Sequence, residues 1–405
     1  MSQTTSQTMT QTTTQTVAPA AELGFCPDRL ARLRAVMQDE VKRQRVPGAV
    51  IMVARHGQLA MFDKVGWQDP LAQSPMQLDS LFRIYSMTKP IVSAAVMMLL
   101  EQGKLLLADP VAKYLPEYQA MQWRDAQGQL HPVKRAITIQ DLLRHTSGLT
   151  YEFLGQNPVQ QQYAALNIGS RERSNDAFSQ ALAGVPLMFE PGSAWEYSRS
   201  TDVLGRLIEV ISGQSLGAYL QQHILKPLGM HDTAFSVPQD QWSRIAEPFA
   251  HDPDGGVPMR VINPRETPAH ESGGGGLIST AQDYARFLQF MLNKGELDGV
   301  RLLAPHIIDF MTADHLGAIP LQRSDLATLL PPGHGFGLGF AVRTRLGESA
   351  VPGSVGMYYW GGIAGTTFFV DPTLDMYAMM LIQAPNQREY YRPLFRNLVY
   401  ASVLR

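Results

Sequence analysis

Cysteine is almost absent from this chain of 405 residues: Cys26 is the only one, which excludes an intrachain disulfide. Long apolar runs are missing too. The best candidate for a membrane span, residues 90–100, is shorter than the ~18 residues that a span needs. It also lies between two charged residues, Lys89 and Glu101. This run therefore predicts a buried core helix, and no membrane span is expected.

The N-terminus lacks the features of a targeting segment. Residues 1–16 contain neither the basic nor the apolar stretch of a secretory signal, so a cytoplasmic location is the default expectation. Ser, Thr and Gln dominate this region, and such residues have little apolar surface to bury. The sequence therefore predicts a disordered tail over residues 1–20.

An excess of positive charge is also lacking. The 34 Lys and Arg residues are balanced by 36 Asp and Glu residues, which gives a net charge of −2. This balance argues against a nucleic-acid-binding protein that works by massed positive charge. Lysine is scarce, with 8 Lys beside 26 Arg, so a lysine in a well-placed motif is more informative than usual.

The apolar pattern divides the rest of the chain into three parts. Helical spacing predicts a helix over residues 28–45, and a strand hairpin follows over residues 49–62. Mostly helical signals then extend to about residue 270. Strands are expected at residues 336–343, 353–360, 366–371 and 376–383, before a terminal helix at 388–404. These parts predict an α/β (α+β) fold. Its sheet subdomain comes from about 21–84 plus 275–405, and the helical subdomain, about 85–274, is inserted between them.

Two serine patterns compete for the role of nucleophile. The first, Gly213-Gln214-Ser215-Leu216-Gly217, matches G-x-S-x-G, which needs a strand before the serine and a helix after it. Here the preceding segment is helical. Gly213 is better explained as the end of that helix and Ser215 as the N-cap of the next one, so we expect a capping role for Ser215.

The second pattern is Ser86-Met87-Thr88-Lys89, an S-x-x-K match at the start of the buried apolar helix. Ser86 and Lys89 lie three residues apart, so one helical turn brings them to the same face. The helix dipole would stabilise an oxyanion near Ser86, and burial would lower the pKa of Lys89 so that it could act as a base. The alternative is a capping serine beside a surface lysine.

Two further segments are candidates for the same site. Tyr197, in a turn-rich stretch before the next helix, could pass a proton to the leaving group, and a nearby Lys89 would lower its pKa. The alternative is a core tyrosine bonded to the backbone. Trp360-Gly361-Gly362 lies at a strand edge, where glycine permits a ligand to approach the backbone closely. The alternative there is a β-bulge with a packed tryptophan.

The order of these motifs along the chain is similar to that in a known protein superfamily. Ser86 and Lys89 open a buried helix, Tyr197-Ser198 follows about 110 residues later, and Trp360-Gly361-Gly362 lies in a late strand. This order resembles the serine β-lactamase and penicillin-binding-protein superfamily, in particular the branch that holds class C β-lactamases and family VIII carboxylesterases. The similarity runs from about residue 23 to 405, and it includes residues 142–149, 189–205, 227–230 and 273–283.

The resemblance implies a mainly antiparallel sheet flanked by helices, with the active site in a cleft beside a helical subdomain. It assigns Ser86 as the acylated nucleophile, Lys89 as its base and Tyr197 as the assisting proton shuttle. It also assigns the backbone N–H groups of Ser86 and Ile363 as the oxyanion hole.

Two departures from class C β-lactamases favour an esterase. Arg199 stands at the third position of their Tyr-x-Asn motif, and Trp360-Gly361-Gly362 stands where they have Lys-Thr-Gly. The missing lysine removes a cation suited to a β-lactam carboxylate, and the indole offers an apolar wall to a neutral group. Arg199 could supply a replacement charge if it faces the cleft.

We therefore expect a serine hydrolase that cleaves small-molecule carboxylic esters through an acyl-enzyme, with no metal or organic cofactor. An acyltransferase, an amidase or a weak β-lactamase would use the same site, and a non-catalytic binding protein could have the same fold. His145, near a helix end, is expected to serve the core or a cap rather than catalysis.

Overall fold

The computed structural model of the chain describes residues 16–404. Its helices are α1 (Pro27–Lys42), α2 (Thr88–Glu101), α3 (Ile139–Leu143), α4 (Pro158–Ala165), α5 (Asn175–Ala183), α6 (Ser200–Ser212), α7 (Leu216–Leu220), α8 (Ala281–Leu292), α9 (Pro305–Met311) and α10 (Arg388–Ser402). Its strands are β1 (Gly48–Arg55), β2 (Gln58–Asp69), β3 (Ser74–Pro75), β4 (Phe82–Arg83), β5 (Gln122–Arg124), β6 (Leu130–Pro132), β7 (Ile278–Ser279), β8 (Glu296–Leu297), β9 (Val300–Arg301), β10 (His334–Phe336), β11 (Ala341–Arg343), β12 (Tyr358–Gly361), β13 (Thr367–Asp371) and β14 (Met376–Ile382).

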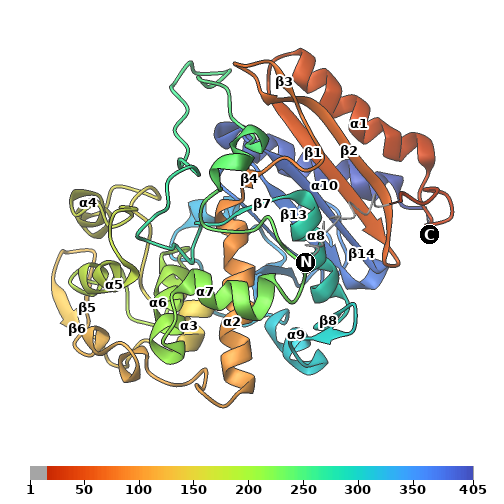
Figure 1. Cartoon of the computed structure of the whole chain (residues 1–405). Coiled ribbons are helices and arrows are strands. Elements are labelled where there is room, and N and C mark those ends of the chain that lie inside the picture. The colour runs from red at the N-terminus through yellow and green to blue at the C-terminus, as the bar shows by residue number, and fades with distance from the viewer. Residues whose placement is uncertain (1–15, 405) are drawn as a thin grey trace, which may run out of the picture.

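The main sheet has eight strands in the order β10-β11-β12-β13-β14-β1-β2-β3. Every neighbouring pair in it is antiparallel. β1 pairs with β14 along its whole length, from Ala49 opposite Ile382 to Arg55 opposite Met376. Strands from both ends of the sequence therefore meet at the centre of one sheet (Figure 1). The mainly antiparallel sheet flanked by helices confirms the predicted fold class.

Alternation along the central strand explains why helices cover both faces of the sheet. In β1, Ala49, Ile51 and Val53 belong to one apolar cluster with α1 and α10. Their neighbours Val50 and Met52 belong to the larger cluster with α2 and α8. Because successive side chains of a strand point to opposite faces, a strand that is apolar throughout must be buried on both sides.

Most local predictions are confirmed within one to a few residues. The first helix, the first hairpin, the last two strands and the terminal helix all form where expected. Thr138 and Asp141 form the capping box of α3, and Thr280 caps α8. The predicted strand over residues 336–343 is wrong: the chain reverses there, with Gly339 at a φ of 103°, and forms the β10–β11 hairpin instead. The turn is short and lies inside an apolar run, so the apolar pattern alone does not distinguish it from a continuous strand.

The predicted tail, residues 1–20, lies mostly outside the described residues. Its described end pairs with the first hairpin, because the N–H group of Ala18 donates to the carbonyl oxygen of Leu59 (2.8 Å). Among the helices of residues 16–404, none combines the length and the apolar character that crossing a bilayer requires.

Helix α2 connects the sheet to the helical part of the chain. Figure 1 shows it running through the middle of the molecule, with α3 to α6 gathered beside it on the side away from α1. Every side chain over residues 88–99 is buried, as the apolar run predicts. The N-terminal end of α2 lies beside β12 and continues from a short 3-10 turn, Tyr85–Met87, so Ser86 lies where the sheet and the helical part meet.

Candidate active site

Ser86 and Lys89 are brought together at the start of α2. The Nζ atom of Lys89 lies 3.1 Å from the Oγ atom of Ser86. Ser86 is partly exposed, whereas Lys89 is fully buried with 0% exposure. Directly before Ser86, Tyr85 has a φ of 43°, a left-handed conformation that residues other than glycine rarely adopt. This bend places the serine hydroxyl at the surface of a cleft while the amine beneath it stays dry.

Burial changes the acid–base chemistry of Lys89. Removing the ammonium group from water lowers the pKa of Lys89 to about 7, although the negative charge of Asp202 partly opposes this effect. Arg199 lowers the pKa further. A large fraction of Lys89 is therefore a neutral amine near neutral pH, with a lone pair that can accept a proton.

Tyr197 lies in the site, but the expectation of an acidic phenol is wrong. Burial is the largest influence and raises the pKa of Tyr197, although hydrogen bonds with Ser86 and Trp360 lower it in part. Near neutral pH a large fraction of the expected cation is a neutral amine, and its Nζ atom lies 4.5 Å from the centre of the Tyr197 ring. The indole Nε1 of Trp360 donates a hydrogen bond to the phenol oxygen (3.1 Å). Tyr197 is thus a neutral phenol held between Ser86 and Trp360.

A second tyrosine, Tyr151, has the contact with Lys89 that was expected for Tyr197. Its hydroxyl lies 3.0 Å from the Nζ atom of Lys89. Burial raises the pKa of Tyr151 well above that of a free phenol, so it also stays protonated. Sequence reasoning missed this residue, because it lies outside the motifs that defined the predicted catalytic residues. Its position directly after the 142–149 motif was the available signal.

The glycine run before β7, residues 273–276, also takes part in the site, although sequence reasoning assigned it no catalytic contact. Lys89 donates a hydrogen bond to the carbonyl oxygen of Gly274 (2.7 Å), and the Gly274 N–H group donates to Asp202 (3.0 Å). Asp202 also accepts a hydrogen bond from Ser272. A Cβ atom at Gly274 would lie 2.6 Å from Asp202 and 3.0 Å from the Tyr151 hydroxyl, so only glycine fits there. A buried acid in an apolar helix, Asp202 in α6, was the signal for this network.

Ser86 and Ile363, whose backbone N–H groups were expected to form the oxyanion hole, both line the cleft. Within residues 16–404, neither the Ser86 nor the Ile363 amide donates to a protein acceptor. Ile363 follows Gly362 in the turn after β12, and the Gly362 carbonyl accepts a hydrogen bond from Arg392 of α10. This carbonyl belongs to the same peptide group as the Ile363 N–H. Arg392 therefore holds that donor in its orientation.

Arg199 borders the cleft, but its charge is already paired. It forms ion pairs with Glu152 and, at 3.6 Å, with Asp202. Its guanidinium carbon also lies 5.0 Å from the centre of the Tyr151 ring. Burial works against the charge of Arg199, but the two carboxylates raise its pKa overall. Arg199 therefore neutralises acids beside the site rather than offering a free cation.

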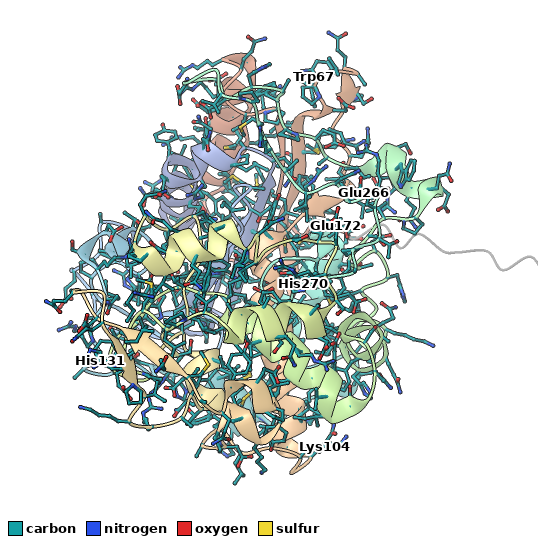
Figure 2. The ribbon with its side chains drawn as sticks, turned by 90° about the vertical axis from the view of Figure 1, so that its left-hand side faces the viewer. Trp67, Lys104, His131, Glu172, Glu266 and His270 are labelled. Carbon is teal, nitrogen blue, oxygen red and sulfur yellow. The ribbon has the colours of Figure 1, made fainter. Side chains whose placement is uncertain are left out.

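The cleft has two lobes that meet at Ser86, Phe153 and Ile363. The first lobe, of about 280 Å³, extends past Tyr197 and Trp360 towards α10. The second lobe, of about 300 Å³, extends towards the loops around residues 169–171 and 260–276. Figure 2 shows Glu172, Glu266 and His270 of these loops on one side of the molecule. The His270 N–H group donates to the carbonyl oxygen of Arg171 (3.1 Å), which joins the two loops. An ester has two parts, and this site has space for both.

Ser215 and His145, which were not expected to act in catalysis, have structural roles. The hydroxyl of Ser215 accepts a hydrogen bond from the Ala218 N–H group (3.2 Å) and caps α7, as predicted. Gly213 ends α6 with a φ of 72°. His145 is buried, and its Nδ1 atom lies 3.0 Å from the Ser198 hydroxyl.

Comparison with known proteins identifies the family of the chain. The sequence model of the Beta-lactamase family matches residues 33–401. The chain belongs to this family. This match confirms the resemblance inferred from the order of the motifs, and its residue range includes the positions from Ser86 to Ile363.

The proteins similar to this chain include one named as an esterase and one described as a hydrolase. Protein Rv1367c of Mycobacterium tuberculosis is 39% identical over 345 residues, which cover 83% of this chain and 85% of that protein. Esterase EstB of Burkholderia gladioli is 35% identical over 376 residues, 87% of this chain and 89% of EstB. The solved structure of EstCE1, a hydrolase with promiscuous acyltransferase activity, has a TM-score of 0.78 at 28% identity and covers 92% of this chain and 99% of EstCE1.

Proposed function

We propose that this protein is a carboxylesterase-type serine hydrolase, which cleaves small-molecule carboxylic esters of short to medium acyl chain length through an acyl-enzyme on Ser86. One observation carries the proposal: a fully buried amine, with a pKa lowered to about 7, lies 3.1 Å from a partly exposed serine hydroxyl. A serine hydroxyl is a weak nucleophile until an adjacent base removes its proton. Similarity to esterases EstB and EstCE1 supports the same reaction class.

Acylation begins with neutral Lys89. Its amine donates one N–H to the Gly274 carbonyl and another to the Tyr151 hydroxyl, which directs the lone pair towards Ser86. As the Oγ atom attacks the ester carbonyl carbon, its proton moves to Nζ, and the carbonyl oxygen becomes an oxyanion. The N–H groups of Ser86 and Ile363 stabilise that oxyanion, because two fixed donors in a dry site need no reorganisation.

The leaving alcohol then needs a proton. Tyr197 keeps its own proton and has a hydrogen bond with Ser86. It is therefore suited to give that proton to the alkoxide as the C–O bond breaks, while the Lys89 ammonium restores it. The ester of Ser86 is hydrolysed by the reverse route: a water molecule attacks the acyl carbon, Lys89 receives the water proton, and Ser86 leaves with a proton as the free acid departs.

The same site predicts a preference for esters over β-lactams. The indole of Trp360 lines the first lobe where class C β-lactamases have a lysine, and Arg199 is held by Glu152 and Asp202. We expect kcat/KM for p-nitrophenyl butyrate to exceed that for nitrocefin by at least about 100-fold, which corresponds to about 3 kcal/mol of transition-state binding. Parallel spectrophotometric assays check this ratio. Comparable values for the two substrates would refute the role given to Trp360.

Acyl transfer to an alcohol is the second candidate, and the likeness to EstCE1 favours it. An alcohol that replaces water in the second step would yield a new ester at the same site. Chromatography of products formed from vinyl butyrate and benzyl alcohol distinguishes the two outcomes. Both routes release acetaldehyde, but transfer yields benzyl butyrate whereas hydrolysis yields butyric acid. No observation favours an amidase or a non-catalytic binding protein. A cytoplasmic location stays a prediction.

A further inference from the structure

A row of arginines lines the first lobe of the cleft. Arg388, Arg392 and Arg396 follow one another at intervals of four residues on α10, so they share one face of that helix. All three border the cavity that contains Ser86, Tyr197 and Trp360. The remainder of its wall is mostly apolar and includes Leu329, Pro331 and Val351.

Almost no negative charge balances this row. Glu389 is the one acid that borders the lobe, and it pairs with Arg388 at 3.4 Å. Within the described residues, Arg392 and Arg396 have no carboxylate within ion-pair distance. Arg392 donates to the carbonyl oxygens of Gly362 and Thr366, and its buried Nε atom has no partner.

Arg396 is equally short of charged partners. It is 7% exposed, and its guanidinium carbon lies 4.0 Å from the centre of the Tyr359 ring. Burial lowers the pKa of Arg392 to about 10, so it remains a cation at neutral pH. Buried cations without counter-ions are costly, and protein interiors usually pair them. Arg199 in the second lobe follows that rule, since it has two carboxylates, whereas Arg392 and Arg396 in the first lobe do not.

We propose that the first lobe binds an ester that carries a carboxylate, and that Arg392 and Arg396, with Arg388 at the rim, supply its counter-charge. This inference rests on the proposed function, and it narrows the substrate from esters in general to anionic ones. Guanidinium groups bind carboxylates with two parallel hydrogen bonds. The apolar wall and Trp360 contact the carbon chain between the ester and the charge.

Two matched pairs of substrates test the proposal. p-Nitrophenyl hemiglutarate and its methyl ester differ only in a charge on the acyl part. 4-Butyryloxybenzoate and its methyl ester differ only in a charge on the alcohol part. We expect kcat/KM for the charged member of at least one pair to be about 10-fold higher than for its neutral partner at low ionic strength. That ratio should fall about 10-fold in Arg396→Gln. It should fall more modestly in Arg388→Gln, because Arg388 is only half-buried at the rim of the lobe.

Arg32→Gln is the matched control, because it removes an exposed cation of α1 that lines neither lobe of the cleft, and it should leave the ratio unchanged. If both charged esters are cleaved no faster than their neutral partners, the anionic substrate is refuted while the esterase stands. If no ester is cleaved, the proposed function fails. The anion site is then tested separately, by measuring the binding of 4-hydroxybenzoate to the protein by calorimetry. Binding that weakens about 10-fold in Arg396→Gln, or in Arg388→Gln if the first variant does not fold, supports that site. Equal or absent binding refutes it.

Discussion

Replacing Ser86 by alanine is expected to reduce the hydrolysis of p-nitrophenyl butyrate by at least about 10⁴-fold. The alanine side chain has no atom that can form the acyl-enzyme, and the lone pair of Lys89 then has no hydroxyl proton to accept. Residual turnover would come only from water held beside the two backbone donors. Steady-state assays, with circular dichroism to establish folding, measure this loss.

Ser215→Ala is the matched control for the same experiment. It removes a hydroxyl that caps α7 through the Ala218 N–H group, so it should cost about 1 kcal/mol of folding free energy and leave kcat/KM near the wild-type value. Mass spectrometry of the protein treated with a fluorophosphonate should locate the adduct on the peptide that contains Ser86. An inactive Ser215→Ala variant, or an adduct on Ser215, would reassign the nucleophile.

Replacing Lys89 by arginine is expected to lower kcat/KM by about 10²–10⁴-fold, the range contributed by a general base. Arginine keeps a positive charge and hydrogen-bond donors, but its pKa is above 12, so it offers no lone pair to Ser86. A loss of rate in Lys89→Arg would therefore show that Lys89 acts as a proton acceptor and not only as a positive charge. Rate measurements on purified Lys89→Arg, at several pH values, test this expectation.

Lys104→Arg, an exposed position just beyond α2, serves as the control and should retain full activity. Because a buried arginine is larger than lysine, Lys89→Met provides a second variant that fits an apolar site and lacks any base. If either Lys89 variant kept more than a third of the wild-type rate, another group would have to be the base.

The centre of the site could be predicted from sequence alone, because its two residues lie close together along the chain. Ser86 and Lys89 lie on one helical turn, and the apolar residues that follow make the helix buried. A dry amine beside a serine follows from those two facts, and the structure agrees in distance and in the direction of the Lys89 pKa. The capping role of Ser215 was local in the same way.

The remaining parts depend on contacts between distant segments. Tyr151 and Gly274 reach Lys89 across 62 and 185 residues of sequence, and no spacing rule connects them. The pKa of Tyr197 was predicted in the wrong direction, because the prediction considered the neighbouring cation but not the extent of burial, which dominates. The ion pairs of Arg199 were invisible for the same reason, since Glu152 comes from another loop.

The pH dependence of kcat/KM for p-nitrophenyl butyrate between pH 5 and 9 tests the central claim most directly. Free enzyme is active only when Lys89 is neutral, so the rate should fall tenfold per pH unit well below a pKa of about 7 and level off above it. Burial lowers the pKa of His145 well below its usual value, so that residue stays neutral and adds no step near 7. A single acid limb near pH 7 is the predicted result. A rate that is flat down to pH 5, or that still rises tenfold per unit at pH 9, would contradict a neutral Lys89 as the base.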